Sequence, residues 1–137
     1  MFFKKDNNKL EKKNLIKICA LLIHAAKIDE DYTKIEEEII TKTLLKFSST
    51  EEDLSQIIVE AKKTEEDSIQ ILDFTKEVKN LSETDKIKII EALWSIIYSN
   101  KNADIYETNL MRRLAGLLYI DNKTMGDIKD KIKKENQ

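Results

Sequence analysis

The stretch HAAKIDEDYTKIEEEII, residues 24–40, contains the end of one helix, an acidic connection and the start of a second helix. After the acids, isoleucines return at the three- and four-residue spacing of a helix face. Thr33 followed by Glu36 has the spacing of a capping box, which starts a helix. The whole chain has no proline and two glycines, so tight turns and glycine-rich phosphate loops are not expected. We therefore predict an all-α fold.

The same apolar spacing continues on both sides of this stretch and predicts seven helices. Their apolar positions span residues 15–26, 35–47, 54–61, 69–81, 87–97, 105–118 and 125–132. Cap spacings like that of Thr33 are expected at Ser49 with Glu52, Thr64 with Asp67, Ser82 with Asp85, and Asp104 with Glu107. The first and fifth helices are the most apolar, so we expect them to form the buried centre.

A length of 137 residues with 41% hydrophobic side chains suits one domain. We expect a flexible basic segment at 1–9 and a helical domain at 10–137. One cysteine, Cys19, and one histidine, His24, exclude a disulfide framework and a structural zinc site. No apolar run approaches the length of a membrane span and no signal peptide is evident, so a cytoplasmic location is expected.

The charge is unevenly distributed, although the net charge is only −2. Residues 29–38 carry six acids against one lysine, and residues 51–85 carry eleven acids against four lysines. Such a surface repels a polyanion, so nucleic acid is not an expected partner. The lysines between 123 and 134 alternate with acids and are expected to form a solvated helix face.

An internal repeat relates the two halves of the chain at an offset of 71 residues. The offset places Leu22 on Leu93, Asp29 on Asn100, Thr33 on Asp104, Glu36 on Glu107 and Ile39 on Leu110. In both halves an apolar helix enters a polar connection and a capped helix follows. We predict a pseudo-two-fold repeat within a single domain.

The residues of this repeat resemble a known family. HAAKIDEDYTKIEEEII at 24–40 and LWSIIYSNKNADIYETNLMRRLAGLLYI at 93–120, joined through DFTKEVKNLSETDKIKIIEALW at 73–94, are similar to the TerB-like tellurite-resistance proteins. That fold is shared with the N-terminal region of a membrane-anchored DnaJ-type co-chaperone. The resemblance implies an all-helical cytoplasmic protein of tellurite and stress resistance. It also implies metal binding by acidic loops, protein partners that include membrane-associated ones, and no enzymatic reaction.

Carried onto this sequence, the resemblance implies metal ligands in both acidic connections. Its aspartate and glutamate positions are Asp29 and Glu36 in the first half, and Asn100, Asp104 and Glu107 in the second. Glu30 and Lys101 stand where the family has glycine, Asn100 replaces an aspartate, and Thr33 replaces a frequent second aspartate. These departures narrow the loop conformations and weaken a cation site in the second half.

The residues themselves add Asp31 to this candidate set, because Asp29, Asp31 and Thr33 place oxygen ligands at alternate positions. An EF-hand is excluded, because Lys34 and Ile40 stand where that loop needs glycine and glutamate. Oxygen ligands without nitrogen or sulfur favour Ca²⁺ or Mg²⁺ over zinc or copper. Helix capping by the same acids is the alternative, and it requires no ion.

Three functions remain open on this sequence. The first is a non-enzymatic interaction module of a stress response, with weak divalent-cation binding. The second is a metal-free, co-chaperone-like adaptor, which lacks the His-Pro-Asp signature of a J domain because the chain has no proline. The third, a small enzyme, is disfavoured because no nucleophile elbow surrounds any serine and Leu21 breaks a di-iron motif before His24. Tyr106 and Tyr119 are the aromatic residues expected to be available for surface contacts.

Overall fold

The computed structural model describes residues 12–27, 34–47, 51–67, 72–99 and 105–135. Seven helices fill these ranges, and no strand occurs in them. The helices are α1 Lys12–Ala26, α2 Lys34–Leu45, α3 Glu51–Asp67, α4 Leu72–Val78, α5 Glu83–Ser99, α6 Ile105–Leu117 and α7 Asn122–Glu135. The predicted all-α fold is confirmed.

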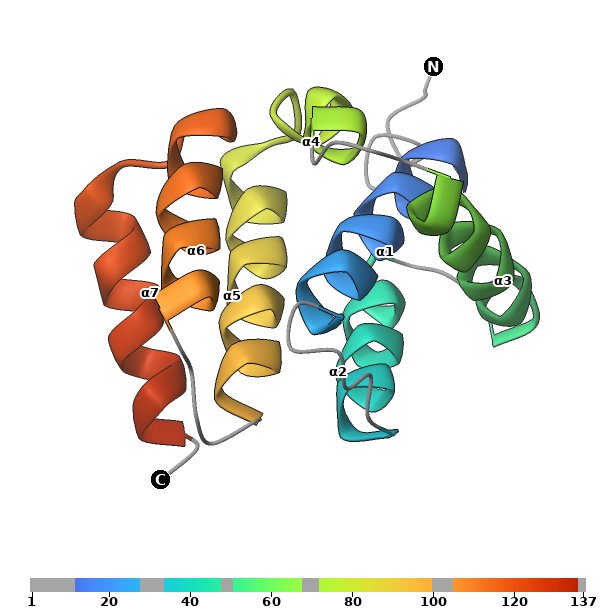
Figure 1. Ribbon diagram of the computed structural model, residues 1–137, viewed down its shortest axis with the longest axis horizontal. Coiled ribbons are helices and arrows are strands. Elements are labelled where there is room, and N and C mark those ends of the chain that lie inside the picture. The colour runs from blue at the N-terminus through green and yellow to red at the C-terminus, as the bar shows by residue number, and fades with distance from the viewer. Residues whose placement is uncertain (1–11, 28–33, 48–50, 68–71, 100–104, 136–137) are drawn as a thin grey trace, which may run out of the picture.

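Helices α1 and α5 form the centre of the molecule, as their composition predicts. Helix α1 packs against α2, α3, α4 and α5, while α5 packs against α1, α2 and α7. In Figure 1, α5, α6 and α7 stand side by side on the left, α1, α2 and α3 lie on the right, and α4 lies at the top. A helix that is apolar on most of its surface must be covered on most sides, and Ile18, Leu22 and Leu93 are completely buried.

The outer helices bury one stripe each. On α3 the buried residues Leu54, Ile57 and Ala61 recur at helical spacing, and on α7 Met125, Ile128 and Ile132 do the same. The Trp94 indole of α5 donates a hydrogen bond to the Met125 sulfur at 3.3 Å, which joins α5 to α7.

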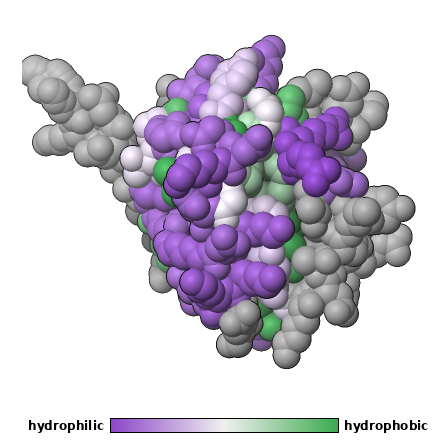
Figure 2. All heavy atoms as spheres, turned by 90° about the vertical axis from the view of Figure 1, so that its left-hand side faces the viewer, coloured by the Kyte–Doolittle hydropathy of each residue, from purple (hydrophilic) through white to green (hydrophobic). Residues whose placement is uncertain are grey.

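The outward face of α7 is charged, as the sequence predicts. Figure 2 shows this side of the molecule covered largely by hydrophilic side chains. Both signs are present on it, and Lys123 pairs with Asp127 at 3.0 Å. This face has the properties of a solvated surface.

Some helix boundaries agree with the predicted caps and others do not. The Ser82 hydroxyl accepts a hydrogen bond from the Asp85 backbone N–H at 3.2 Å, so Ser82 caps α5 as predicted. The cap predicted at Thr64 is wrong, because α3 continues through Thr64 to Asp67. The polar residues 62–67 suit the exposed end of a helix whose buried stripe ends near Ala61. Helix α4 is shorter than predicted and ends at Val78, before Leu81.

Helix α6 ends in a Schellman motif with an unusual residue at its left-handed position. The Ile120 N–H donates to the Ala115 carbonyl at 2.9 Å, and the Tyr119 N–H donates to the Gly116 carbonyl at 3.3 Å. Tyr119 has φ 58°, where glycine is the usual residue, and for a residue with a side chain this conformation costs about 1–2 kcal/mol. The Tyr119 side chain is 70% exposed, so packing in the core does not offset that cost.

Candidate functional site

The two connections that carry the predicted ligands follow α1 and α5, the two central helices. The first is acidic, and in the second Asp104 is balanced by Lys101. The first lies between Lys27 and Lys34 and the second between Ser99 and Ile105. In Figure 1 the start of α2 and the end of α5 both lie toward the bottom of the molecule. Helix α2 follows the first connection and α5 precedes the second. Because α2 packs against α5, the two halves of the predicted site adjoin neighbouring helices.

Of the six predicted metal ligands, the structure describes one side chain. Asp29, Asp31, Asn100 and Asp104 lie outside the described residues. Glu107 lies in α6, where only its place in the helix is described. Glu36 lies in the first turn of α2 and is 2% exposed. The predicted meeting of both connections, and the internal repeat that motivates it, therefore stay predictions.

The burial of Glu36 distinguishes it from its two neighbours. Glu38 is exposed, and the side chain of Glu37 is 43% exposed, with its oxygen 4.0 Å from the Lys62 ammonium. A buried carboxylate is costly unless polar groups stabilise it, and the backbone N–H groups of a helix N-terminus are suited to that task. Sequence alone predicts that Glu36 lies at the start of the helix but not that it is buried. Glu36, Glu37 and Glu38 have the same side chain, so their identity does not show which one faces the core.

Within the described ranges, no group of three histidine, cysteine, aspartate or glutamate side chains is arranged to hold a metal ion. A cation site that includes Glu36 would therefore need ligands from outside the described side chains, and the predicted ones lie in the two connections and at Glu107. The donors predicted there are all oxygens, and this donor set fits a hard cation such as Ca²⁺ or Mg²⁺.

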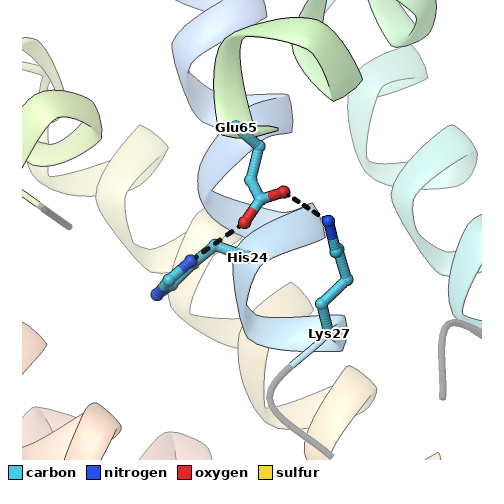
Figure 3. Close-up of polar contacts among 3 residues, drawn as sticks. All are labelled: His24, Lys27 and Glu65. Atoms are coloured by element: carbon cyan, nitrogen blue, oxygen red, sulfur yellow. Dashed lines mark hydrogen bonds and ion pairs between the residues drawn. The ribbon is translucent and has the colours of Figure 1, made fainter. Parts of the chain in front are cut away.

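A polar cluster lies directly before the first connection (Figure 3). Glu65, from the last turn of α3, points at the end of α1, where its carboxylate meets two side chains. The Lys27 ammonium donates to one oxygen at 2.8 Å, and His24 Nδ1 lies 3.2 Å from the other. The Glu65 side chain is 10% exposed, so this carboxylate is largely shielded from water.

The pKa values of the cluster follow from these contacts. Burial raises the pKa of the Glu65 carboxyl, but the hydrogen bonds from Lys27 and His24 outweigh burial and hold that pKa below its usual value. The hydrogen bond to Glu65 raises the pKa of the Lys27 ammonium. Both groups are therefore ionised at neutral pH, and the pair fixes the end of α1 against α3. The sequence does not reveal this contact, because Glu65 lies 41 residues from His24 and nothing in its own segment marks it.

The cysteine and histidine do not form a nucleophilic site. Cys19 is completely buried, as predicted for a small core residue, and burial raises the pKa of its thiol to about 12. A thiol with that pKa is protonated at neutral pH and is not a nucleophile. His24 contacts Glu65 and the Phe74 ring, whose centroid is 5.9 Å away, and among the described residues no hydroxyl or thiol is hydrogen-bonded to it.

Comparison with known proteins identifies the family. The family model described as Tellurite resistance protein TerB matches residues 15–130, a range that includes most of each of the seven helices. No curated protein and no solved structure matches the chain. None of the helices in the described ranges has the length and apolar character needed to cross a membrane. The match agrees with the all-helical architecture, and the chain belongs to the TerB family.

Proposed function

We propose that this TerB-family protein is a non-enzymatic interaction module of a tellurite or general stress response, and that its acidic connections bind a divalent cation weakly. Family membership supports the helical module. Cation binding and a role in the stress response go beyond family membership and are the further parts of the proposal. The buried carboxylate of Glu36 is the observation that supports cation binding.

Glu36 provides a fixed oxygen ligand at the end of the molecule where both connections start. A carboxylate that the fold already holds in place loses less conformational entropy on binding than a mobile surface carboxylate does. Asp29 and Asp31 from the first connection, Asn100 and Asp104 from the second, and Glu107 from the first turn of α6 would complete an oxygen shell with water. Ca²⁺ and Mg²⁺ bind such oxygen shells through carboxylates, amide oxygens and water. The neutral side chain of Asn100 and the positive charge of Lys101 both reduce the affinity, so we expect weak binding.

The state of Cys19 and His24 supports a non-enzymatic role. A protonated buried thiol and an imidazole turned toward Glu65 leave this part of the core without an activated nucleophile. The described geometry instead supports a rigid frame. The contact between Glu65 and Lys27 holds α1 in place at the last described residue before the first connection.

The cation is tested by titrating the ¹⁵N-labelled full chain with Ca²⁺, Mg²⁺ and Mn²⁺ while amide shifts are followed. We expect saturable shifts near Glu36 with a dissociation constant of about 0.1–1 mM, the range of weak calcium modules. Glu36→Gln is expected to weaken binding by about tenfold, and Glu38→Gln, an exposed carboxylate on the same helix, is the matched control. Asp29→Asn tests a predicted ligand in the first connection without changing any residue of the described helices. Amide shifts that increase linearly with ion concentration up to several millimolar, without saturating, would refute cation binding.

A metal-free adaptor is the second candidate, because the position of Glu36 in the first turn of α2 is also explained without an ion. A glutamate in the first turn of a helix stabilises that helix without any ion, through the backbone N–H groups and the helix dipole. If this is its whole role, Glu36→Gln lowers the melting temperature equally with and without Ca²⁺. If a cation is also bound, Ca²⁺ raises the melting temperature of the unmodified protein and of Glu38→Gln, and raises that of Glu36→Gln by clearly less.

A further inference from the structure

A hollow of about 500 Å³ lies at the other end of the molecule, between the end of α4 and the end of α6. In Figure 1 these helix ends lie at the top, away from the start of α2 and the end of α5. The described residues that line it are Thr75, Lys76, Lys79, Gly116, Leu117 and Tyr119. Two of these six are lysines and none is an acid. A Cβ added at Gly116 would meet nothing within 4 Å, so the space above this helix turn is open.

Tyr119 forms one wall of the hollow in a conformation that tyrosine disfavours. Its left-handed φ of 58° ends α6, and glycine would serve this geometry without strain. The tyrosine ring is 70% exposed and therefore contributes little to the core. An exposed aromatic side chain in a disfavoured conformation suggests a function outside folding.

Two lysine ammonium groups lie near this ring. Lys79 Nζ is 6.0 Å and Lys86 Nζ is 5.8 Å from the Tyr119 ring centroid, within cation–π range. Lys86 is only 7% exposed, and in the described part of the chain neither lysine forms an ion pair with a carboxylate. A buried ammonium is normally paired with an anion, because removing it from water is costly. Among the described residues, the positive charge in and beside the hollow therefore has no carboxylate partner.

We propose that this hollow binds an acidic peptide segment of a partner protein. Carboxylates of the segment pair with Lys76 and Lys79, and an apolar side chain lies over Gly116 and Leu117 against the Tyr119 ring. Lys86 does not line the hollow, but its ammonium lies 5.8 Å from the Tyr119 ring centroid and adds positive charge beside it. The helix C-termini oppose an anion only in part. Each contributes at most about half a negative charge, against three lysines. A nucleic acid is a poorer fit, because the acidic remainder of the chain repels a long polyanion.

This inference rests on the protein being an interaction module, but not on the cation. Peptide binding is therefore measured in EDTA, where the acidic connections hold no ion, and cation binding is measured in the titration described above. If the peptide does not bind but the cation titration saturates, only the proposal of peptide binding at the hollow is overturned. If the peptide binds but the cation titration does not saturate, only the proposal of cation binding is overturned.

The probe is a short fluorescein-labelled peptide of glutamates around a central leucine–phenylalanine pair, and its glutamine analogue is the control peptide. Fluorescence anisotropy gives the affinity, and amide shifts of the full chain locate the site. We expect shifts at Gly116, Leu117 and Tyr119. Lys76→Gln and Lys79→Gln are each expected to weaken binding by about threefold, and more at low salt. Lys63→Gln removes an exposed lysine of α3 and serves as the matched control.

Tyr119→Gly separates binding from folding. It is expected to weaken peptide binding by about tenfold, as loss of an aromatic anchor does, without lowering the melting temperature. Tyr119→Phe keeps the ring and should keep the affinity within about twofold. A lower melting temperature in Tyr119→Gly would show that the ring serves the fold, against the proposal.

Four other outcomes would overturn the peptide assignment. One is equal binding of the glutamine analogue, and another is an equal loss in Lys63→Gln. The third is displacement of the peptide by inorganic phosphate that produces the same shifts, which would make the hollow a small-anion site. Concentration-dependent shifts of the hollow in the protein alone would place a second copy of the chain there instead.

Discussion

Replacing Glu65 with glutamine tests whether the contact between α1 and α3 stabilises the fold. The variant keeps the size of the side chain and one oxygen acceptor, but it removes the charge that faces Lys27 and His24. Ion pairs exposed on a surface contribute about 0.2–1 kcal/mol each. Both partners are partly exposed, at 44% for the Lys27 side chain and 36% for that of His24, whereas Glu65 is 10% exposed. We therefore expect each contact to contribute near the top of that range, about 1–2 kcal/mol together.

Urea unfolding followed by far-ultraviolet circular dichroism measures this difference. For a chain of this size, 1 kcal/mol corresponds to a change in melting temperature of about 3 °C. Glu66→Gln, an exposed residue beside Glu65 on α3, is the control and should change stability by less than about 0.5 kcal/mol. A double-mutant cycle with Lys27→Met isolates the pair and should give a coupling of about 0.5–1 kcal/mol.

The pH dependence of this prediction has a definite sign. The pKa of the Glu65 carboxyl is lower in the folded protein than its usual value of 4.5. The stability it contributes is then complete above pH 4.5 and is lost as the pH falls through the lower folded-state pKa. The difference between the unmodified protein and Glu65→Gln should be constant from pH 7 to pH 5 and should shrink below pH 4.5. Equal stability of Glu65→Gln and Glu66→Gln at pH 7 would refute the reasoning.

Three further predictions concern the core and the helix boundaries. Leu22→Ala removes a completely buried side chain of α1 and should cost about 2–5 kcal/mol in urea unfolding, and a loss below 1 kcal/mol would contradict its central place in the core. Ser82→Ala removes the acceptor for the Asp85 N–H and should cost about 1 kcal/mol, whereas Ser55→Ala, at an exposed position within α3, should cost nothing. Cys19 should not react with iodoacetamide at pH 8 in the folded protein and should react fully in urea, and rapid labelling of the folded protein would exclude both its burial and its raised pKa.

The sequence predicts the helices well because each has a local signal, and it predicts the contacts between them poorly because those have none. Apolar spacing marks α1, α5 and α7, and Ser82 marks the start of α5. The same cap spacing at Thr64 is misleading, because a helix continues through such a pair when no competing signal stops it. The burial of Glu36 and the position of Glu65 depend on which helices meet. Lys86 shows the same limit, since a lysine within a run of charged residues gives no indication that it is buried.

The two proposed sites lie at opposite ends of α5, and this separation determines how they relate. Lys86 lies near the start of the helix and Ser99 at its end, and a helix of 17 residues is about 25 Å long. That length is about three times the Debye length at physiological ionic strength, so an ion held by the acidic connections exerts little direct field at the hollow. Coupling between the sites would require α5 to move as a rigid element, but its packing against α1, α2 and α7 restrains it from three sides. If both proposals hold, the protein is a helical frame with a cation site at one end of α5 and a basic peptide site at the other, and each site binds its ligand independently.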